Sequence, residues 1–390
     1  MRPLNTLLIG CGAMGRGQAA IIAGLPGYRL VAVCDVLPAA AAEVAAKHRC
    51  AHGTDPAALM REHHPEVVAI CTGNDTHAAL TLLAVEHGAR AVYCEKPMAV
   101  DLDDARRMVA ACTAAGTRLV INHQRRTGAD LRAMRAAIAS GAIGQVRRVV
   151  VQNAGDVLSD GTHAVDSLRF LLGDAPWERV VAQVHRGDPA LKPKPQRQSD
   201  RAGWRFGHPV EDGAMALIDV AGGIRAELRC GDCIEGYTSY QSYEVFGTTG
   251  RLWRWGDCQP CAASGQGGAP TWNGNVLISD GQPGTHRAVF DPASWPYRAQ
   301  PQAGGDWRLL DPDGDPLRNL IADAYDTLAR CLESGAPHPM DAVVGLADME
   351  LVTAIYASAE RGAPVKPGDL PGTFPLKRMC ADARTLAAHG

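Results

Sequence analysis

Six residues near the N-terminus constrain the fold of this 390-residue chain more than any others. The run Gly10-Cys11-Gly12-Ala13-Met14-Gly15 has the spacing G-x-G-x-x-G, follows a short apolar run and opens a helical pattern. In that setting the first glycine permits a tight turn, the second lets the backbone approach a pyrophosphate, and the third lets the helix pack closely on the strand. A helix N-terminus also attracts negative charge. The motif therefore predicts a strand, turn and helix that bind a dinucleotide.

Short β-branched runs alternate with amphipathic stretches over the first 120 residues, which is typical of a parallel sheet covered by helices. The clearest helix spans Leu102–Ala115, with Asp101 as its predicted N-cap and Gly116 at its end. Asp35 closes the second predicted strand, where a carboxylate accepts hydrogen bonds from both ribose hydroxyls. Val36 and Leu37 follow, so no cation is present there for a 2'-phosphate, and NAD is favoured over NADP. The predicted strands are 6–9, 30–34, 67–71, 91–94 and 119–122.

Beyond residue 120 the pattern changes to helices mixed with strands of antiparallel type. Two Gly- and Pro-rich segments, 186–200 and 258–283, are predicted as loops. The predicted elements are helices at 131–140, 165–172, 320–332 and 343–359, and strands at 146–152, 224–229, 243–246 and 251–255. We therefore predict an α/β Rossmann domain over residues 1–122, followed by an α+β domain over residues 123–390 with a large, mostly antiparallel open sheet.

Charge and cysteine usage narrow the class of protein. A formal net charge of -3 provides no field for binding nucleic acid or an anionic membrane surface. No apolar stretch is expected to reach the roughly 18–20 residues of a spanning helix, and the N-terminal apolar run is too short for a signal peptide. The twelve cysteines are scattered, unlike those of a secreted disulfide scaffold. These features predict a cytoplasmic protein with reduced thiols.

Polar clusters follow two further predicted strands, at the sheet edge where open α/β sheets bind ligands. One is the run from Cys71 to His77, and the other is Glu95-Lys96-Pro97. A lysine beside a nicotinamide can donate to a carbonyl oxygen or take a carbinol proton. Because Pro97 restricts the preceding residue to extended geometry, the Lys96 side chain is expected to point into the crevice.

These segments, in this order and at this spacing, resemble the glucose-fructose oxidoreductase / inositol dehydrogenase (Gfo/Idh/MocA) family. The resemblance extends to 122–126, 161–166, 247–250 and the final helices. It implies that the pyrophosphate is held by Gly10, Gly12, Ala13, Met14 and Gly15, the adenosine ribose by Asp35, and the nicotinamide side by Thr72, Asn74, His77 and Glu95. It also implies that Lys96 is the catalytic lysine, with a bond to Pro97 that is often cis in relatives, and that His163 is the acid/base. Gln124 and Arg125 are further cofactor-binding candidates.

The sequence departs from the family pattern beside His163. Polyol dehydrogenases of this family carry an aspartate four residues before the histidine, and here that position is Ser159. Asp160 lies three residues before His163, and both offsets reach the same helix face, so Asp160 is the candidate that orients the imidazole or the substrate hydroxyls. Arg125 and Arg126 have two open interpretations: contact with nicotinamide or substrate, or solvated anchors.

Two Cys-x-x-Cys pairs, Cys230 with Cys233 and Cys258 with Cys261, leave a structural zinc site open as an interpretation. The 24 residues between the pairs exceed the usual spacing of roughly 15–20, so unligated thiols are favoured and no metal is predicted.

The sequence thus predicts an NAD-dependent enzyme that transfers a hydride to or from a secondary alcohol or ketone of a sugar, anhydrosugar, glycoside or inositol-like polyol. Two alternatives stay open: an NAD-dependent glycosidase that works by transient oxidation and elimination, and a sugar-sensing protein without turnover. Lys96 and His163 argue against the sensor, which needs neither. The resemblance also implies a homo-dimer or homo-tetramer formed through the second-domain sheet.

Overall fold

The computed structural model describes residues 2–186, 203–234, 241–254, 276–279, 286–290, 299–301, 307–309 and 316–377. The chain divides into two compact units. Unit 1 comprises Met1–Gln124 with Arg318–Met349, and unit 2 comprises Arg125–Leu317 with Glu350–Gly390.

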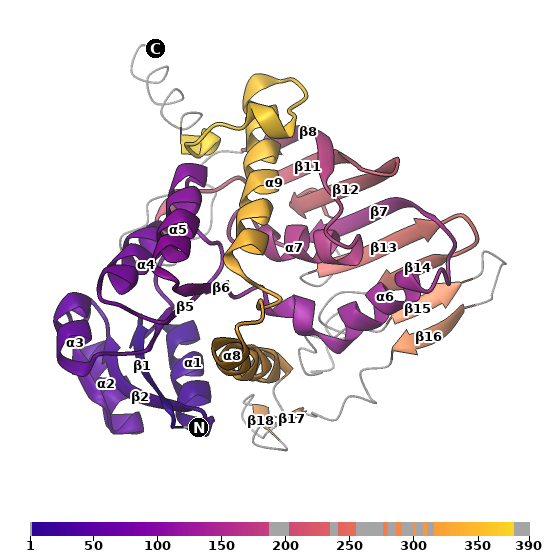
Figure 1. The fold of residues 1–390 in the computed structure, drawn as a ribbon. Coiled ribbons are helices and arrows are strands. Elements are labelled where there is room, and N and C mark those ends of the chain that lie inside the picture. The colour runs from indigo at the N-terminus through magenta and orange to yellow at the C-terminus, as the bar shows by residue number, and fades with distance from the viewer. Residues whose placement is uncertain are drawn as a thin grey trace, which may run out of the picture. The chain divides into compact units, whose positions relative to one another are not determined.

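Unit 1 is built on a six-stranded parallel sheet with the strand order β3-β2-β1-β4-β5-β6. Strands β1, β2, β5 and β6 are labelled in Figure 1. Every residue of β4 and β5 is buried, as expected for parallel strands covered on both faces. The strands are β1 (Leu4–Ile9), β2 (Tyr28–Cys34), β3 (Ala51–Gly53), β4 (Val67–Ile70), β5 (Ala91–Cys94) and β6 (Arg118–Ile121). The helices between them are α1 (Ala13–Gly24), α2 (Pro38–His48), α3 (Pro56–His63), η1 (Asn74–Thr76), α4 (His77–Glu86) and α5 (Leu102–Ala115).

The parallel sheet confirms the predicted Rossmann-type domain, and the five predicted strands agree with the observed ones to within two residues at each end. Strand β3 was not predicted, because three residues are too few to show a periodicity. Helix α5 has the predicted bounds, and Gly116 ends it in the left-handed conformation, with φ 71°.

A helix distant in sequence completes the core of unit 1. Tyr325 of α8 (Pro316–Ser334) stacks on Tyr93 of β5 with ring centroids 4.2 Å apart. Its hydroxyl donates to Gln18 Oε1 of α1 at 2.6 Å, and its carbonyl accepts from the Tyr28 hydroxyl. The helical pattern of α8 predicted a helix but not its partners, because periodicity reports a buried face and not what covers it.

Unit 2 contains an eight-stranded mixed sheet with the order β16-β15-β14-β13-β7-β12-β11-β8. The pair β7 and β12 is parallel, and the other neighbours are antiparallel, which confirms the mostly antiparallel second sheet. Helices α6 and α7 lie against this sheet (Figure 1). The strands of the sheet are β7 (Val146–Asn153), β8 (Trp177–His185), β11 (Gly213–Val220), β12 (Ile224–Gly231), β13 (Gln241–Gly247), β14 (Arg251–Arg254), β15 (Val276–Ser279) and β16 (His286–Phe290).

The described residues also form shorter strands and several further helices. Two pairs of short strands are β9 (Trp204–Arg205) with β10 (His208–Pro209), and β17 (Ala299–Pro301) with β18 (Trp307–Leu309). The helices are η2 (Gln124–Thr127), α6 (Ala129–Ala139), α7 (Gly161–Leu171), α9 (Ala342–Arg361) and η6 (Pro367–Asp369).

The prediction of a loop over 258–283 is wrong at 276–279, the part of this segment that the structure describes. Val276–Ser279 form β15, which pairs with β14, because the apolar residues at 276–278 have a core to enter although glycines and prolines surround them in sequence. Strands β8 and β11 were also not predicted. Apart from Arg186, the predicted loop at 186–200 lies outside the described residues.

Helix α9 corrects the expectation that no apolar stretch reaches membrane-spanning length. It has 20 residues and a mean hydropathy of 1.4 in its most apolar window, enough by length and composition alone. Of that window, 61% is buried inside the protein, as in a core helix.

Candidate functional site

The carboxyl ends of the parallel strands in unit 1 bring the sequence-predicted segments to one edge of the sheet. The glycine turn follows β1, Asp35 follows β2, the run beginning at Thr72 follows β4, and Glu95-Lys96 follows β5. Ligands of open parallel sheets bind at this edge.

Each of the three positions in the turn favours glycine for a different steric reason. Gly10 has φ +98°, and a Cβ there would lie 2.4 Å from the Cys71 carbonyl oxygen. A Cβ on Gly15 would lie 1.8 Å from the Gly10 carbonyl oxygen. Nothing lies within 4 Å of the Cβ position of Gly12, so the backbone there is open to close approach by a ligand. This matches the turn, approach and packing roles expected of the motif.

Asp35 is oriented by the backbone of the turn it faces. Its Oδ2 accepts from Cys11 N at 2.7 Å and its Oδ1 accepts from Leu37 N at 2.9 Å. Each carboxylate oxygen keeps a further lone pair for a ribose hydroxyl. Val36 and Leu37 are exposed beside it and carry no charge.

The residues present fit NAD. The first backbone N–H groups of α1 have no intrahelical acceptor, because the helix begins directly after the turn at Ala13. Gly12, Ala13 and Met14 are all exposed, which leaves this N-terminus open to a pyrophosphate.

Glu95 is held rigidly at the end of β5. The side chain is buried, and its Oε1 accepts from Gln18 Nε2 at 2.5 Å and from Asn122 Nδ2 at 2.8 Å. Burial raises the pKa of its carboxyl above the ordinary range. Sequence reasoning did not find Gln18 or Asn122 as its partners, because no motif links these positions.

His77 is buried and connects the two polar segments. Its Nδ1 donates to the Pro97 carbonyl at 2.8 Å, and Nε2 lies 3.4 Å from the Thr72 carbonyl. Burial lowers the pKa of the ring, which favours the neutral form with its proton on Nδ1. The hydroxyls of Thr72 and Thr76 lie 2.6 Å apart in the same turn, and Asn74 is buried in η1. Thus His77 holds the segment around Thr72 against the one around Lys96.

Lys96 is half-buried and joined to Pro97 by a cis peptide bond, as the resemblance implied. The preceding backbone is fixed in the sheet, since Glu95 N donates to the Ile70 carbonyl at 2.9 Å and Asn122 N donates to the Cys94 carbonyl at 2.8 Å.

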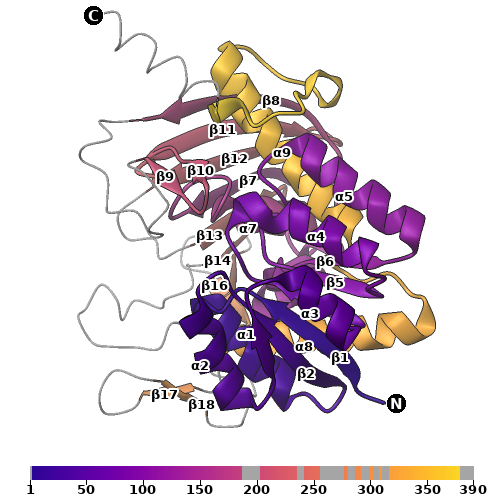
Figure 2. The same cartoon turned by 90° about the vertical axis from the view of Figure 1, so that its left-hand side faces the viewer.

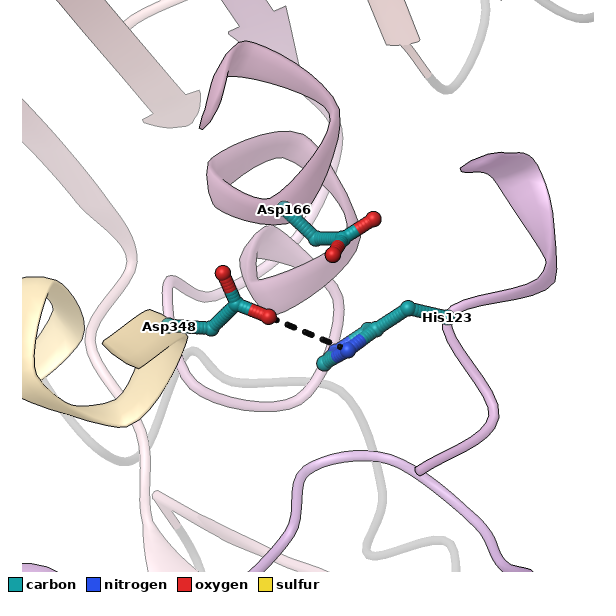
Figure 3. Close-up of side chains that lie close together, drawn as sticks. All are labelled: His123, Asp166 and Asp348. Atoms are coloured by element: carbon teal, nitrogen blue, oxygen red, sulfur yellow. Dashed lines mark ion pairs between the residues drawn. The ribbon is translucent and has the colours of Figure 1, made fainter. Parts of the chain in front are cut away.

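Unit 1 also contains a buried pair that the sequence did not predict. His123 Nδ1, just after β6, lies 3.2 Å from Asp348 Oδ2 of α9 (Figure 3). Both side chains are buried, and their separation of more than 200 positions explains why no sequence pattern indicates the pair.

In unit 2, His163 is the third residue of α7 and is buried. Its backbone N–H donates to the Asp160 carbonyl at 3.2 Å. The Asp160 carboxylate pairs with Arg205 Nη1 at 2.5 Å. A Cβ on Gly155 would lie 2.2 Å from Asp160 Oδ2, so the turn before α7 is shaped around this carboxylate. The sequence predicted Asp160 as a candidate but not Arg205.

The Arg126 guanidinium lies inside unit 2, so the interpretation as a solvated anchor is wrong. It pairs with Asp166 in the middle of α7 and with Asp174 after the helix, at 2.7 Å and 3.0 Å. It also lies over the Phe170 ring, 5.5 Å from the centroid. These contacts anchor α7 at two points.

Gln124 and Arg125 are both buried in or beside η2. Their assignment to the cofactor stays a prediction, as do the roles assigned to the other candidate residues.

The described half of the cysteine pattern consists of Cys230 and Cys233. Cys230 is buried in β12, and burial raises the pKa of its thiol well above the ordinary range, so the protonated form is favoured. Cys258 and Cys261 lie outside the described residues.

An NAD-binding Rossmann domain followed by a mixed-sheet domain defines the class of this protein. A model of the oxidoreductase family with NAD-binding Rossmann fold matches residues 4–123, and a model of the GFO/IDH/MocA C-terminal domain matches residues 131–253. Together the matches cover more than half of the chain, which therefore belongs to the GFO/IDH/MocA family of oxidoreductases.

Similar proteins include an inositol 2-dehydrogenase of Rhizobium meliloti, 33% identical over 43% of this chain and 55% of the relative. A 1,5-anhydro-D-fructose reductase of Ensifer adhaerens is 33% identical over 50% of this chain and 58% of the relative. The chain thus matches little more than half the length of these relatives. An oxidoreductase from Agrobacterium radiobacter, solved in complex with NAD+, L-tartaric acid and magnesium, has the same fold, with a TM-score of 0.71 and 21% identity over 94% of this chain and 98% of that one.

Proposed function

We propose that this protein transfers a hydride between NAD and a secondary alcohol or ketone of a sugar, anhydrosugar, glycoside or inositol-like polyol. The observation that carries the proposal is the edge of the unit 1 sheet, where the glycine turn, Asp35 and Lys96 follow successive strands. The names of the two relatives, which act on an inositol and an anhydrosugar ketone, support the substrate class.

The chain's own residues then bind and orient the reactants. The open backbone at Gly12 and the α1 N-terminus bind the pyrophosphate, and Asp35 accepts from the adenosine ribose. Thr72, Asn74, His77, Glu95, Gln124 and Arg125 position the nicotinamide side. NAD, when bound, supplies the hydride chemistry.

Lys96 and His163 manage the hydroxyl proton in this proposal. The Lys96 side chain donates to the reacting oxygen, and the His163 imidazole takes or returns the proton, since imidazole as a group changes charge near neutrality. Asp160 orients the site together with its partner Arg205.

We also propose that the protein works in the cytoplasm as a homo-dimer or homo-tetramer. Val181 of β8 pairs with Leu217 of β11, and both are exposed, as is Met215 on the same face. An apolar strip on an open sheet is suited to a self-complementary interface. Light scattering that returns only a monomer at micromolar concentration contradicts this part.

An NAD-reduction screen of sugars, anhydrosugars, inositols and glycosides tests the activity. Wild type is expected to reduce free NAD with at least one substrate. Lys96→Ala is expected to lower kcat by about 100-fold or more while the Kd for NAD stays within about threefold. Lys47→Ala, an exposed lysine of α2, is the matched control with unchanged kcat.

The screen also separates the alternatives. Undiminished turnover in Lys96→Ala overturns the mechanism. Glycoside cleavage without net NAD reduction indicates the glycosidase, and sugar binding without any turnover indicates the sensor.

A further inference from the structure

The turn between β7 and α7, residues 154–160, ends three residues before His163 and is held in large part by one distant segment. That segment is 204–211, which contains the β9–β10 hairpin (Figure 2). Four of its side-chain contacts reach the turn, from Arg205, His208 and Glu211. We call residues 204–211 the clamp segment.

Glu211 makes a buried contact with the turn. Its Oε1 accepts from Val157 N at 2.5 Å, and its Oε2 accepts from the Tyr356 hydroxyl of α9 at 2.8 Å. The Tyr356 oxygen in turn accepts from Leu158 N at 3.2 Å. Glu211 and Tyr356 thereby satisfy two consecutive backbone N–H groups of the turn, and both side chains are buried.

The other clamp contacts fix the following two residues. His208 Nδ1 donates to the Pro209 carbonyl at 2.9 Å, so in the neutral ring Nε2 accepts from the Ser159 hydroxyl at 3.0 Å. Arg205 pairs with Asp160 at 2.5 Å and lies 3.5 Å from Asp156. Residues 157–160 are therefore all held from the clamp segment, directly or through Tyr356.

Burying an acid at this place is unfavourable for stability. Desolvation and the nearby Asp156 carboxylate raise the pKa of Glu211 to about 7. Cys230 and Tyr356 face the same carboxyl from β12 and α9. An apolar pair of similar volume is often as stable as such a buried polar group. Glu211 instead fixes the orientation of the turn, because its carboxylate accepts a hydrogen bond from one specific backbone N–H group, that of Val157.

We propose that Glu211 is a positioning residue for turnover, which holds the turn before α7 so that His163 keeps the orientation that catalysis needs. The proposal rests on the proposed function above, in which His163 handles the substrate proton. Glu211 itself touches neither reactant: it acts through Val157 and Tyr356.

The experiment compares Glu211→Ala, Glu211→Gln and wild type with the substrate found in the screen. Glu211→Ala is expected to lower kcat about tenfold with an unchanged KM for NAD, and to increase amide hydrogen exchange at 156–163 but not at 13–24. Glu211→Gln keeps an acceptor for Val157 N and is expected to keep kcat within about threefold of wild type. Glu178→Ala, an exposed glutamate of β8, is the matched control.

If Glu211→Ala does not fold, Tyr356→Phe makes the same test. It removes the hydroxyl that links Glu211 to Leu158 but keeps the ring, whose centroid lies 4.7 Å from that of Phe374. We expect about a threefold loss of kcat and the same local increase in exchange.

Wild-type kcat and wild-type exchange at 156–163 in a folded Glu211→Ala, or in Tyr356→Phe, overturn the proposal. A tenfold loss of kcat in Glu211→Gln as well overturns the role of the acceptor. If wild type turns over no substrate, the proposed function has failed, and the exchange measurement still decides whether Glu211 holds the turn.

Discussion

The segments that follow β1, β2, β4 and β5 form one edge of the unit 1 sheet, which we call the nucleotide edge. This edge and the turn before α7 in unit 2 are built in opposite ways. The nucleotide edge consists of short segments that directly follow strands, and backbone groups form much of it. These are the Gly10 turn, the α1 N-terminus and the Cys11 N–H that orients Asp35. The turn in unit 2 depends on buried polar side chains from distant positions, among them Glu211 and Tyr356.

This difference predicts that the two regions are sensitive to different kinds of substitution. A binding site formed by backbone loses affinity when a substitution places a side chain in space that only glycine leaves open, because close-packed backbone cannot move aside. A site held by buried charges fails when one partner is removed, because the remaining charge stays desolvated. Four measurements test the contrast, from the largest expected effect to the smallest.

Gly15→Ala is expected to abolish NAD binding, with a loss of affinity of about 1000-fold or more. The new methyl group would lie 1.8 Å from the Gly10 carbonyl oxygen, which forces α1 away from the turn. Gly17→Ala is the control in the same helix, because nothing lies within 4 Å of its Cβ position. Calorimetric titration of NAD checks both variants, and equal affinities would contradict the steric argument.

Arg254→Met is expected to lower the free energy of unfolding by about 3–5 kcal/mol, because it leaves Asp130 buried without its charged partner. Arg254 also donates to the Gln241 carbonyl at 2.9 Å, and the Gln241 side chain donates to Asn153, the last residue of β7 before the turn.

Adding Asp130→Leu to Arg254→Met is expected to restore part of this stability. Arg179→Met, which breaks the exposed pair with Asp219, is expected to change it by about 0.5 kcal/mol or less. Denaturant unfolding measures all three variants, and an equal loss for Arg179→Met and Arg254→Met would refute the role of burial.

Asp35→Ala is expected to weaken NAD binding about 30-fold, because it removes the proposed ribose acceptor and leaves the Cys11 N–H of the turn without the Asp35 carboxylate. Asp55→Ala is the control: its carboxylate accepts from Ala57 N and Ala58 N at the start of α3, so the loss is expected in stability, about 1 kcal/mol, and not in NAD affinity. A Kd for NAD that is unchanged in Asp35→Ala would remove this residue from the cofactor site.

The smallest expected effect is a pH dependence of stability. The pKa of Glu211 is raised from 4.5 to about 7, so the folded chain binds this proton more tightly than the unfolded chain. The resulting stabilisation is fully present below pH 4.5 and is lost as the pH rises through 7. Relative to Glu211→Gln, wild type is expected to lose about 1–2 kcal/mol between pH 6 and pH 8.

Thermal unfolding of both proteins across this range checks the prediction. The groups near Glu211 include Asp156, which Arg205 partly compensates, and the neutral Tyr356 and Cys230. A constant difference in Tm between wild type and Glu211→Gln from pH 6 to pH 8 would show that Glu211 does not titrate there.

Some site residues could be predicted from sequence because their chemistry is local. Gly10, Gly15 and Asp35 act within one strand, turn and helix, so their spacing carries the structural reason. Lys96 was singled out because it follows a strand and precedes a proline, and the family resemblance implied its catalytic role, which stays a prediction. Gln18 and Asn122, which hold Glu95, carry no such signal: each is an ordinary polar residue until the fold brings it to a buried carboxylate.

The sequence alone determined five of the six strands of the unit 1 sheet, helix α5, the glycine turn and the residues at the strand ends, because these follow from local periodicity and from the steric freedom of glycine. Only the tertiary structure decided that α8 completes unit 1 through Tyr325, that β15 lies within an expected loop, and that Arg126 is buried. It also decided that Glu211 and Tyr356 hold the turn before His163. These contacts join positions tens to hundreds of residues apart, and each affects stability because the groups that it joins are buried.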